Sequence, residues 1–234
     1  MTLKNLPKLV DDVVCQLSHW KNRKDFKQMR SESGVYSLKG FDRLKCIYIH
    51  IPKAAGISIN KALFDNYGGG HKTVRVYKRI FGPAVYKEYF TFTFVRNPYS
   101  RLLSAYRFLK NGGFSETDRT WAIQNLSEYS SFDDFIKLWI DEESIWSLNH
   151  FKPQYSFVCD VSLTPEVDFI GKVESIEEDF EKVCSILNIP NKLEIRNKGK
   201  TDNTNWEHFY SDYSIDKITD IYSRDFELFQ YEKL

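Results

Sequence analysis

One stretch of the chain, Cys46–Ile59, constrains the fold more strongly than any other. It reads CIYIHIPKAAGISI, and its isoleucines alternate with residues that are themselves largely apolar or aromatic. This pattern predicts a central strand that is covered on both faces. Pro52 ends the strand because proline has no N–H to donate to a sheet. A helical pattern follows and stops at Gly68–Gly70, so the order strand, tight loop, helix is predicted.

The loop between this strand and this helix has the composition of an anion-binding site. A tight loop directs backbone N–H groups and the N-terminus of the next helix toward an anion, and Lys53 adds a positive charge beside them. The loop is not a Walker A motif, because GxxxxGK[ST] is absent. An ordinary strand-to-helix turn with a solvated lysine is the alternative, and this stretch alone leaves both interpretations open.

A second strand, loop and helix follow further along the chain. Tyr89–Val95 is rich in aromatic residues and threonine, and it predicts another buried strand. Asn97 suits the N-cap position of a helix predicted over residues 98–110, which begins with proline. Within that helix Arg101 and Ser104 are three residues apart and therefore share a face.

Both units present groups that bind anions directly after a strand. The first offers Lys53, backbone N–H groups and Ser58, and the second offers Arg96 and Ser104. Parallel sheets bind ligands at the carboxyl ends of their strands, where the lysine and the arginine both fall. Arginine also provides a planar fork that suits a phosphate group. One such unit would be weak support, but two at matched strand ends predict a site for a phosphorylated ligand.

The rest of the chain continues the alternation of strands and helices, which predicts an α/β fold with a mainly parallel sheet. The further elements that we expect are a helix near residues 5–20, a polar and basic loop or loose extension over Trp20–Ser33, an amphipathic helix at Phe132–Ile140, a short strand at Val167–Ile170 and a helix that opens with a capping box at Ser175–Glu178.

The composition narrows the classes of function. A net charge of +1 over 234 residues implies no general attraction to nucleic acid. The four cysteines form no CxxC pair and no zinc spacing, so no metal site is expected. Cys46 and Cys184 lie in apolar patterns and predict buried thiols in a reducing compartment. We recognise no signal peptide and no membrane-spanning run, and we therefore expect a cytoplasmic protein.

Several motifs of the chain resemble one family. Ile51–Ser58 reads IPKAAGIS and Arg96–Tyr106 reads RNPYSRLLSAY. They resemble the loops that hold the 5′-phosphosulfate and the 3′-phosphate in sulfotransferases that use 3′-phosphoadenosine 5′-phosphosulfate (PAPS), in particular the carbohydrate branch (sulfotransferase family 2, HNK-1-type). Further blocks are similar to that family in the same order: NHFKPQY (Asn149–Tyr155), DFIGKVESIEEDF (Asp168–Phe180) and YSRDFELFQY (Tyr222–Tyr231).

The resemblance implies a P-loop-like three-layer fold with a central, mainly parallel sheet flanked by helices over residues 41–234. Residues 1–40 match no motif of the family and are expected to form an N-terminal helical and basic extension. PAPS is the implied co-substrate, a carbohydrate or glycan-precursor hydroxyl is the implied acceptor, and no metal is implied. The implied PAPS-binding residues are Pro52, Lys53, Ala54, Ala55, Gly56, Ile57, Ser58, Arg96, Arg101 and Ser104, while Lys198 and Lys200 either close over the nucleotide or belong to a solvated loop.

The resemblance also implies catalytic roles. Sulfuryl transfer is in-line, and Lys53 is implied to stabilise the charge that grows on the oxygen between sulfur and the leaving phosphate. The acceptor hydroxyl needs a base, and histidine suits this role because its pKa lies near neutrality. We prefer His71, which follows a glycine run where related enzymes often carry a histidine, and His150 is the alternative. A structural role stays open for each, and His50 is expected to be a packed core histidine.

Two positions depart from the family motif. Threonine usually follows the lysine and another precedes the serine, but Ala54 and Ile57 stand there in this chain, so two hydroxyl donors are missing. A protein that binds PAPS or another nucleotide without catalysis is therefore the alternative function. A P-loop-type kinase is disfavoured because the Walker A motif is absent.

The source and compartment are also predicted. Because no signal or anchor is recognised, the chain looks unlike an animal Golgi enzyme. A soluble bacterial enzyme that acts in the cytoplasm on a surface polysaccharide precursor is expected instead. The oligomeric state cannot be inferred from the sequence.

Overall fold

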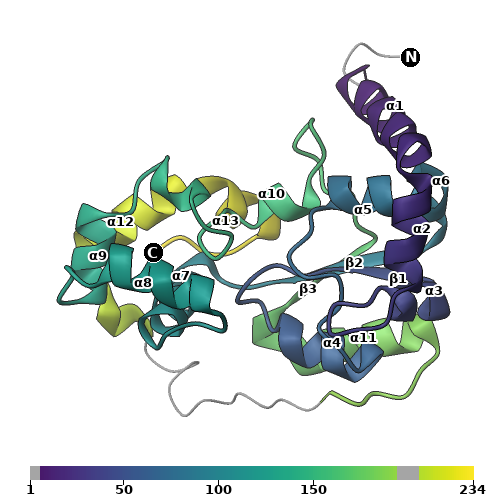
Figure 1. The fold of residues 1–234 in the computed structure, drawn as a ribbon. Helices are drawn as coiled ribbons and strands as arrows, with labels where there is room; N and C mark the ends of the chain where they lie inside the picture. Colours follow the sequence, from purple (N-terminus) through teal and green to yellow (C-terminus); the bar gives the residue numbers. More distant parts are fainter. Residues whose placement is uncertain (1–5, 194–205) are drawn as a thin grey trace. The chain divides into compact units, whose positions relative to one another are not determined.

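The chain forms two compact units in the computed structural model, which describes residues 6–193 and 206–234 (Figure 1). Within the described residues, unit 1 comprises residues 6–95 and 154–193, and unit 2 comprises residues 96–153 and 206–234. No helix in either unit is both long and apolar enough to cross a membrane, as far as the described residues go. The expected division of the chain at residue 40 stays a prediction.

Unit 1 contains a three-stranded parallel sheet in the order β1 (Cys46–Ile49), β2 (Phe90–Val95) and β3 (Phe169–Lys172). All of β1 and nearly all of β2 are buried, as the continuous apolar character of these segments requires. The predicted parallel α/β sheet is therefore confirmed. The strands begin and end within about two residues of the predicted positions, which is the usual uncertainty of such boundaries.

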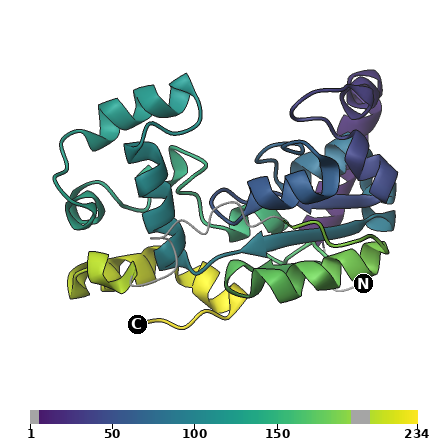
Figure 2. The same cartoon turned by 90° about the horizontal axis from the view of Figure 1, so that it is seen from below.

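Helices flank this sheet. In Figure 1, α5 lies above the sheet, whereas α4 and α11 lie below it, and Figure 2 shows α11 running alongside the strands. The helices of unit 1 that contribute to this arrangement are α3 (Lys39–Leu44), α4 (Gly56–Phe64), α5 (Val74–Phe81), α6 (Pro83–Glu88), α10 (Tyr155–Val158) and α11 (Ile176–Leu187), with a short 3₁₀ helix, η3 (Val173–Ser175), before the last of them.

The N-terminal part of unit 1 is more helical than the sequence suggests. The helix expected near residues 5–20 is confirmed as α1 (Leu6–Lys21), which packs on α5. The prediction of a loop or loose extension over Trp20–Ser33 is wrong, because α2 (Arg23–Ser31) forms there. Phe26 of α2 stacks on His19 of α1 with 6.2 Å between ring centroids, a contact that the polar composition of α2 does not reveal.

Unit 2 is helical around an aromatic core. Tyr99, Phe135, Phe151 and Tyr222 are among its buried members, and the Tyr222 hydroxyl donates a hydrogen bond to the Phe151 carbonyl at 2.6 Å. The elements of unit 2 are α7 (Pro98–Lys110), α8 (Glu116–Leu126), α9 (Phe132–Leu138), α12 (Asp212–Ile221) and α13 (Ser223–Phe229), with the 3₁₀ helices η2 (Ser144–Trp146) and η4 (Trp206–Phe209).

Candidate active site

The loop after β1 reaches the start of α4 through an unusual backbone. Lys53 and Ala55 have positive φ angles of 67° and 60°, which turn the chain sharply at two positions within three residues. Ala55 occupies the N-cap position, and its methyl group cannot accept a hydrogen bond from the first turn of α4. No side chain caps the start of this helix, and N–H groups in such a position are suited to binding an anion.

Gly56 is required in this loop by a close approach. A Cβ atom at this position would lie 1.8 Å from Nε2 and Cδ2 of His50, so the His50 ring rests directly against the glycine. His50 is buried, as expected for a core histidine. Its ring nevertheless touches the first residue of α4, so this histidine supports the proposed anion-binding loop.

His71 contacts the same histidine. The His71 and His50 ring centroids are 4.5 Å apart, with the rings edge to face. His50 also stacks on Tyr48 and lies 3.4 Å, between ring Nδ1 and amide Nδ2, from Asn60 of α4. A chain of direct contacts therefore runs from His71 through His50 to Gly56, and it places the preferred base one ring away from the loop.

The segment that carries His71 is held in place by its neighbours. The Lys72 ammonium group donates a hydrogen bond to the Gly69 carbonyl, and burial lowers the pKa of Lys72. Thr73 caps α5 by accepting a hydrogen bond from the Val76 N–H. His71 itself is half-buried, so it is neither a freely solvated side chain nor a fully packed one.

The remaining residues of the loop differ in exposure. Pro52 and Ala54 are buried, Lys53 and Ser58 are half-buried, and Ile57 is exposed. The two positions that lack the family's threonine are therefore very different in environment. Backbone N–H groups and the Ser58 hydroxyl are the loop's own hydrogen-bond donors for an anion, together with the Lys53 ammonium group.

In unit 2, Arg96 and Ser104 lie at the beginning and in the middle of the α7 segment. The predicted cap is confirmed, because the Asn97 side chain accepts from the N–H groups of Tyr99 and Ser100. Arg96 Nε donates to the Ser100 hydroxyl at 3.0 Å, which fixes the arginine against its own helix. Arg96 and Ser104 are both buried, at 8% and 9% exposure.

Arg101 makes contacts within the protein that the motif does not indicate. Its side chain is buried, and its Nη2 donates to the carbonyl groups of His150 at 3.3 Å and Lys152 at 2.9 Å. Burial lowers the pKa of Arg101, and the neighbouring Tyr222 and Asp225 act in the opposite direction. This geometry makes Arg101 an anchor for the Asn149–Tyr155 block, and a contact with PAPS stays a prediction.

His150, the alternative base, lies in unit 2. It is buried and stacks on Phe108, with ring centroids 5.1 Å apart. The His150 ring is thus packed against another aromatic ring. His71, in contrast, belongs to unit 1, which also contains the loop after β1.

Two other predictions concern lysines and metals. Lys198 and Lys200 lie outside the described residues. Across residues 6–193 and 206–234, no cluster of histidine, cysteine, aspartate or glutamate that could hold a metal ion is found.

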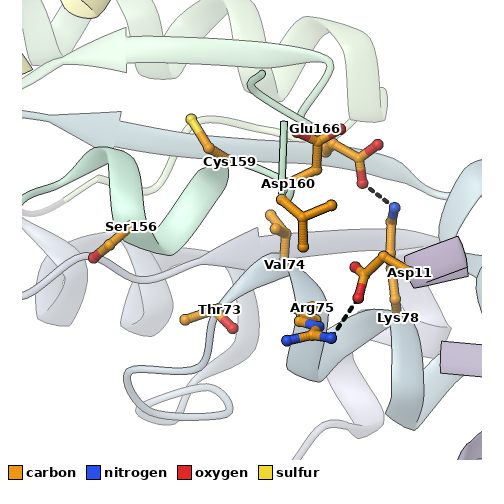
Figure 3. A pocket seen from close by; sticks show the side chains of 10 residues that line it. Asp11, Thr73, Val74, Arg75, Lys78, Ser156, Cys159, Asp160 and Glu166 are labelled. Atoms are coloured by element: carbon orange, nitrogen blue, oxygen red, sulfur yellow. Dashed lines mark ion pairs between the residues drawn. The ribbon is translucent and has the colours of Figure 1, made fainter. Parts of the chain in front are cut away.

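A cavity of about 140 Å³ lies elsewhere in unit 1, between α1, α5 and residues 156–166 (Figure 3). Its wall carries paired charges, since Arg75 contacts Asp11 at 2.6 Å and Lys78 contacts Glu166. Thr73 also lines it, but no residue of the loop after β1 does. The cavity is therefore separate from the proposed anion site.

Sequence reasoning missed the part that His50, Asn60 and Lys72 play around the loop. For His50 a signal was present, because alternation along β1 places Tyr48 and His50 on one face next to the loop. For Asn60 no signal was present, because its contact runs from α4 to His50, ten residues earlier in the chain. The Lys72 ammonium group bonds to the Gly69 carbonyl only three residues earlier, but nothing in the local pattern indicates this contact.

A parallel sheet whose first strand leads through a tight, lysine-bearing loop into a helix without a side-chain cap defines a P-loop-like α/β protein. The chain belongs to the sulfotransferase family, whose model matches residues 38–232. The predicted family and fold class are thereby confirmed. No solved structure gives a significant match to the chain.

The chain is similar to several curated proteins at low identity. It is 26% identical to carbohydrate sulfotransferase 12 of Xenopus laevis over 82% of this chain and 59% of that protein. It is 28% identical to human carbohydrate sulfotransferase 14 over 44% of this chain and 30% of that protein. An uncharacterized protein of Archaeoglobus fulgidus is 32% identical over 52% of this chain and 88% of its own length. The chain thus spans less than two thirds of the length of these two carbohydrate sulfotransferases.

These relatives correct one expectation. We expected a bacterial, cytoplasmic enzyme that looks unlike an animal Golgi enzyme, but the named carbohydrate sulfotransferases come from frog, fish, mouse, rat and human. The expectation depended on the absence of a recognisable signal or anchor, which says nothing about kinship.

Proposed function

We propose that this chain transfers the sulfuryl group of PAPS to a hydroxyl group of a carbohydrate. The observation that carries the proposal is the contact chain His71–His50–Gly56, which joins a candidate base to a lysine-bearing anion loop within one unit. Membership of the sulfotransferase family and the names of the similar carbohydrate sulfotransferases support the same chemistry.

In the proposed reaction the acceptor oxygen forms a bond to sulfur while the bond from sulfur to the bridging phosphate oxygen breaks. The loop N–H groups and Ser58 hold the phosphosulfate, and Lys53 neutralises the negative charge that grows on the departing oxygen. Removing one preorganised donor of this kind typically costs roughly 10²–10³ in rate. The product nucleotide is 3′-phosphoadenosine 5′-phosphate.

The proton of the acceptor hydroxyl passes to a base, and we assign this role to His71. His71 is half-buried and edge-on to His50, so its ring is held in one place yet not enclosed. His150 is the alternative, but its stacking on Phe108 favours a structural role.

The proposal assigns the 3′-phosphate to Arg96 and Ser104, as the second motif implies. An arginine that is already fixed by its bond to Ser100 loses little freedom when it binds a phosphate, which favours binding.

Thermal shift measurements test the donor. 3′-phosphoadenosine 5′-phosphate should raise the melting temperature, because a ligand that binds only the native state stabilises it. ATP, which lacks the 3′-phosphate, should raise it much less, and Arg96→Ala should reduce the difference between the two nucleotides. Lys110→Ala, an exposed lysine later on α7, serves as the control. Equal shifts for both nucleotides in the wild type would contradict the assignment of PAPS.

A further inference from the structure

Helix α1 is attached to unit 1 by its polar side. Asp11 pairs with Arg75, the Cys15 thiol lies 3.9 Å from the Arg75 carbonyl, and His19 Nδ1 lies 2.8 Å from the Arg79 carbonyl. Asp11, Cys15 and His19 follow one another at intervals of four residues and therefore form one stripe along the helix. That stripe faces α5.

The opposite side of α1 is apolar and exposed. A surface helix ordinarily buries its apolar stripe and leaves its polar stripe to water, so this orientation is inverted. Contiguous exposed apolar surface marks a site of interaction. The exposed side chains, which are between 40% and 64% accessible, are Leu9, Val10, Val13, Val14, Leu17 and Trp20.

The same side becomes basic where α1 passes into α2. The Asn22 N–H bonds to the Ser18 carbonyl and the Phe26 N–H to the Asn22 carbonyl, so the helical path continues through the junction. Lys24 and Lys27 come seven residues after Leu17 and Trp20, which is two helical turns along the same side. Between Trp20 and Arg30 the chain carries five basic residues, and Asp25 is the only acid.

We propose that this face, the apolar stripe of α1 together with Lys21, Lys24 and Lys27, is a docking surface for an anionic lipid bilayer. The helix lies in the plane of the membrane surface, with its valines and leucines at the boundary between headgroups and acyl chains. Trp20 suits the interface between water and lipid, and the lysines contact the anionic headgroups.

The positive charge of Lys21, Lys24 and Lys27 favours an anionic bilayer over a second copy of the chain as the partner of this surface. A second copy that faced the stripe with its own stripe would offer the lysines either apolar side chains or other lysines. Neither neutralises their charge, whereas an anionic bilayer satisfies the apolar stripe and the lysines together.

Flotation with lipid vesicles tests the proposal. The full chain should bind vesicles of phosphatidylcholine mixed with phosphatidylserine and bind pure phosphatidylcholine much less. Added salt should weaken the binding, because salt screens attraction between exposed charges. Light scattering on the free protein reports its oligomeric state in parallel.

Matched variants separate the two parts of the surface. Val13→Gln combined with Leu17→Gln should lower the vesicle affinity by about tenfold or more, because apolar burial is lost. Leu138→Gln combined with Ile186→Gln, which are also exposed, should leave it unchanged. Lys24→Glu with Lys27→Glu should abolish the preference for phosphatidylserine, whereas Lys87→Glu with Lys192→Glu, at exposed positions elsewhere, should preserve it.

Each variant should keep the circular dichroism spectrum and melting temperature of the wild type, since only exposed side chains change. Absence of binding to anionic vesicles would overturn the proposal, and so would equal losses in the variants and their controls. Formation of a dimer that Val13→Gln with Leu17→Gln disrupts, without vesicle binding by the wild type, would assign the stripe to a second copy instead.

Discussion

Ala55 occupies a backbone conformation that favours glycine, while the next residue, Gly56, is a position where a side chain does not fit. The positive φ of Ala55 costs an L-residue about 1–2 kcal/mol. Glycine avoids this cost, but its greater conformational freedom in the unfolded chain offsets part of the gain in stability. Ala55→Gly should therefore stabilise the protein by about 0.5–1 kcal/mol. Gly56→Ala should destabilise it by about 1–3 kcal/mol, because the new Cβ displaces the His50 ring.

Thermal or urea unfolding of the two variants beside the wild type measures these opposite effects. Loss of stability in Ala55→Gly, or an unchanged stability in Gly56→Ala, would show that the loop does not have this backbone.

The proposed base is tested at the same scale. His71→Gln should lower kcat by roughly 10²–10⁴ while nucleotide binding is kept, because a general base contributes that much to rate. The rate of the wild type should rise with pH as a histidine loses its proton, and the variant should lack this rise. His150→Gln is the parallel variant. If it loses the rise while His71→Gln keeps both the rise and the rate, His150 is the base.

Individual residues differ in how far the sequence predicts them. Lys53 and Gly56 could be placed in an anion loop because strand, loop and helix are local patterns. The anchoring contacts of Arg101 could not be predicted, because they are made to the carbonyls of His150 and Lys152, about fifty residues away. Arg96, Arg101 and Ser104 of this motif are all buried, and nothing local says that Arg101 is the one that contacts these carbonyls.

At the scale of elements, Asp133 joins α9 to the start of α12. It accepts hydrogen bonds from the N–H and hydroxyl of Ser211, from the Ser214 hydroxyl and from Lys137. Burial alone would raise the pKa of Asp133, but these hydrogen bonds hold it well below the ordinary value of 3.8. The charged carboxylate therefore stabilises the fold above that ordinary value, and this stabilisation is lost as the pH falls below 3.8 toward the lowered pKa.

Asp133→Asn should consequently lower the stability at neutral pH by about 1–2 kcal/mol, a range reduced for the partial exposure of the group. The difference in melting temperature from the wild type should shrink as the pH falls below 3.8, because the wild-type carboxylate is then protonated as well. Asp216→Asn, at an exposed position on α12, is the control. A difference that stays constant with pH would mean that charge is not what holds these helices together.

Helices and strands could be predicted where a local sequence pattern specifies them, but not where a tertiary contact determines which face is buried or which group is capped. The spacing of apolar residues in α1 predicts the helix correctly. The same spacing also predicts that the apolar stripe is buried, but in the structure this stripe is exposed. The polar stripe is buried instead, because it pairs with α5. The capping box predicted at Ser175–Glu178 is wrong. The Ser175 hydroxyl donates to Asp179, which also accepts from the Lys172 N–H at 2.9 Å.

At the scale of the whole molecule, the division into two compact units is a feature that no sequence pattern indicates. The chain leaves unit 1 between Val95 and Arg96 and returns between Pro153 and Gln154. The first crossing falls at the start of the motif Arg96–Tyr106 and the second inside the block Asn149–Tyr155, and neither is a flexible linker rich in glycine and serine. Because each unit is built from two separate stretches of chain, only long-range contacts define it.

The most direct test of the central claim is sulfuryl transfer itself. The protein is incubated with PAPS and a panel of carbohydrates, and mass spectrometry detects an acceptor that has gained one sulfuryl group together with 3′-phosphoadenosine 5′-phosphate. We predict product formation by the wild type and a loss of roughly 10²–10³ in rate for Lys53→Ala, with nucleotide binding retained. Nucleotide binding by the wild type without any sulfated product, or full activity in Lys53→Ala, would contradict the proposed mechanism.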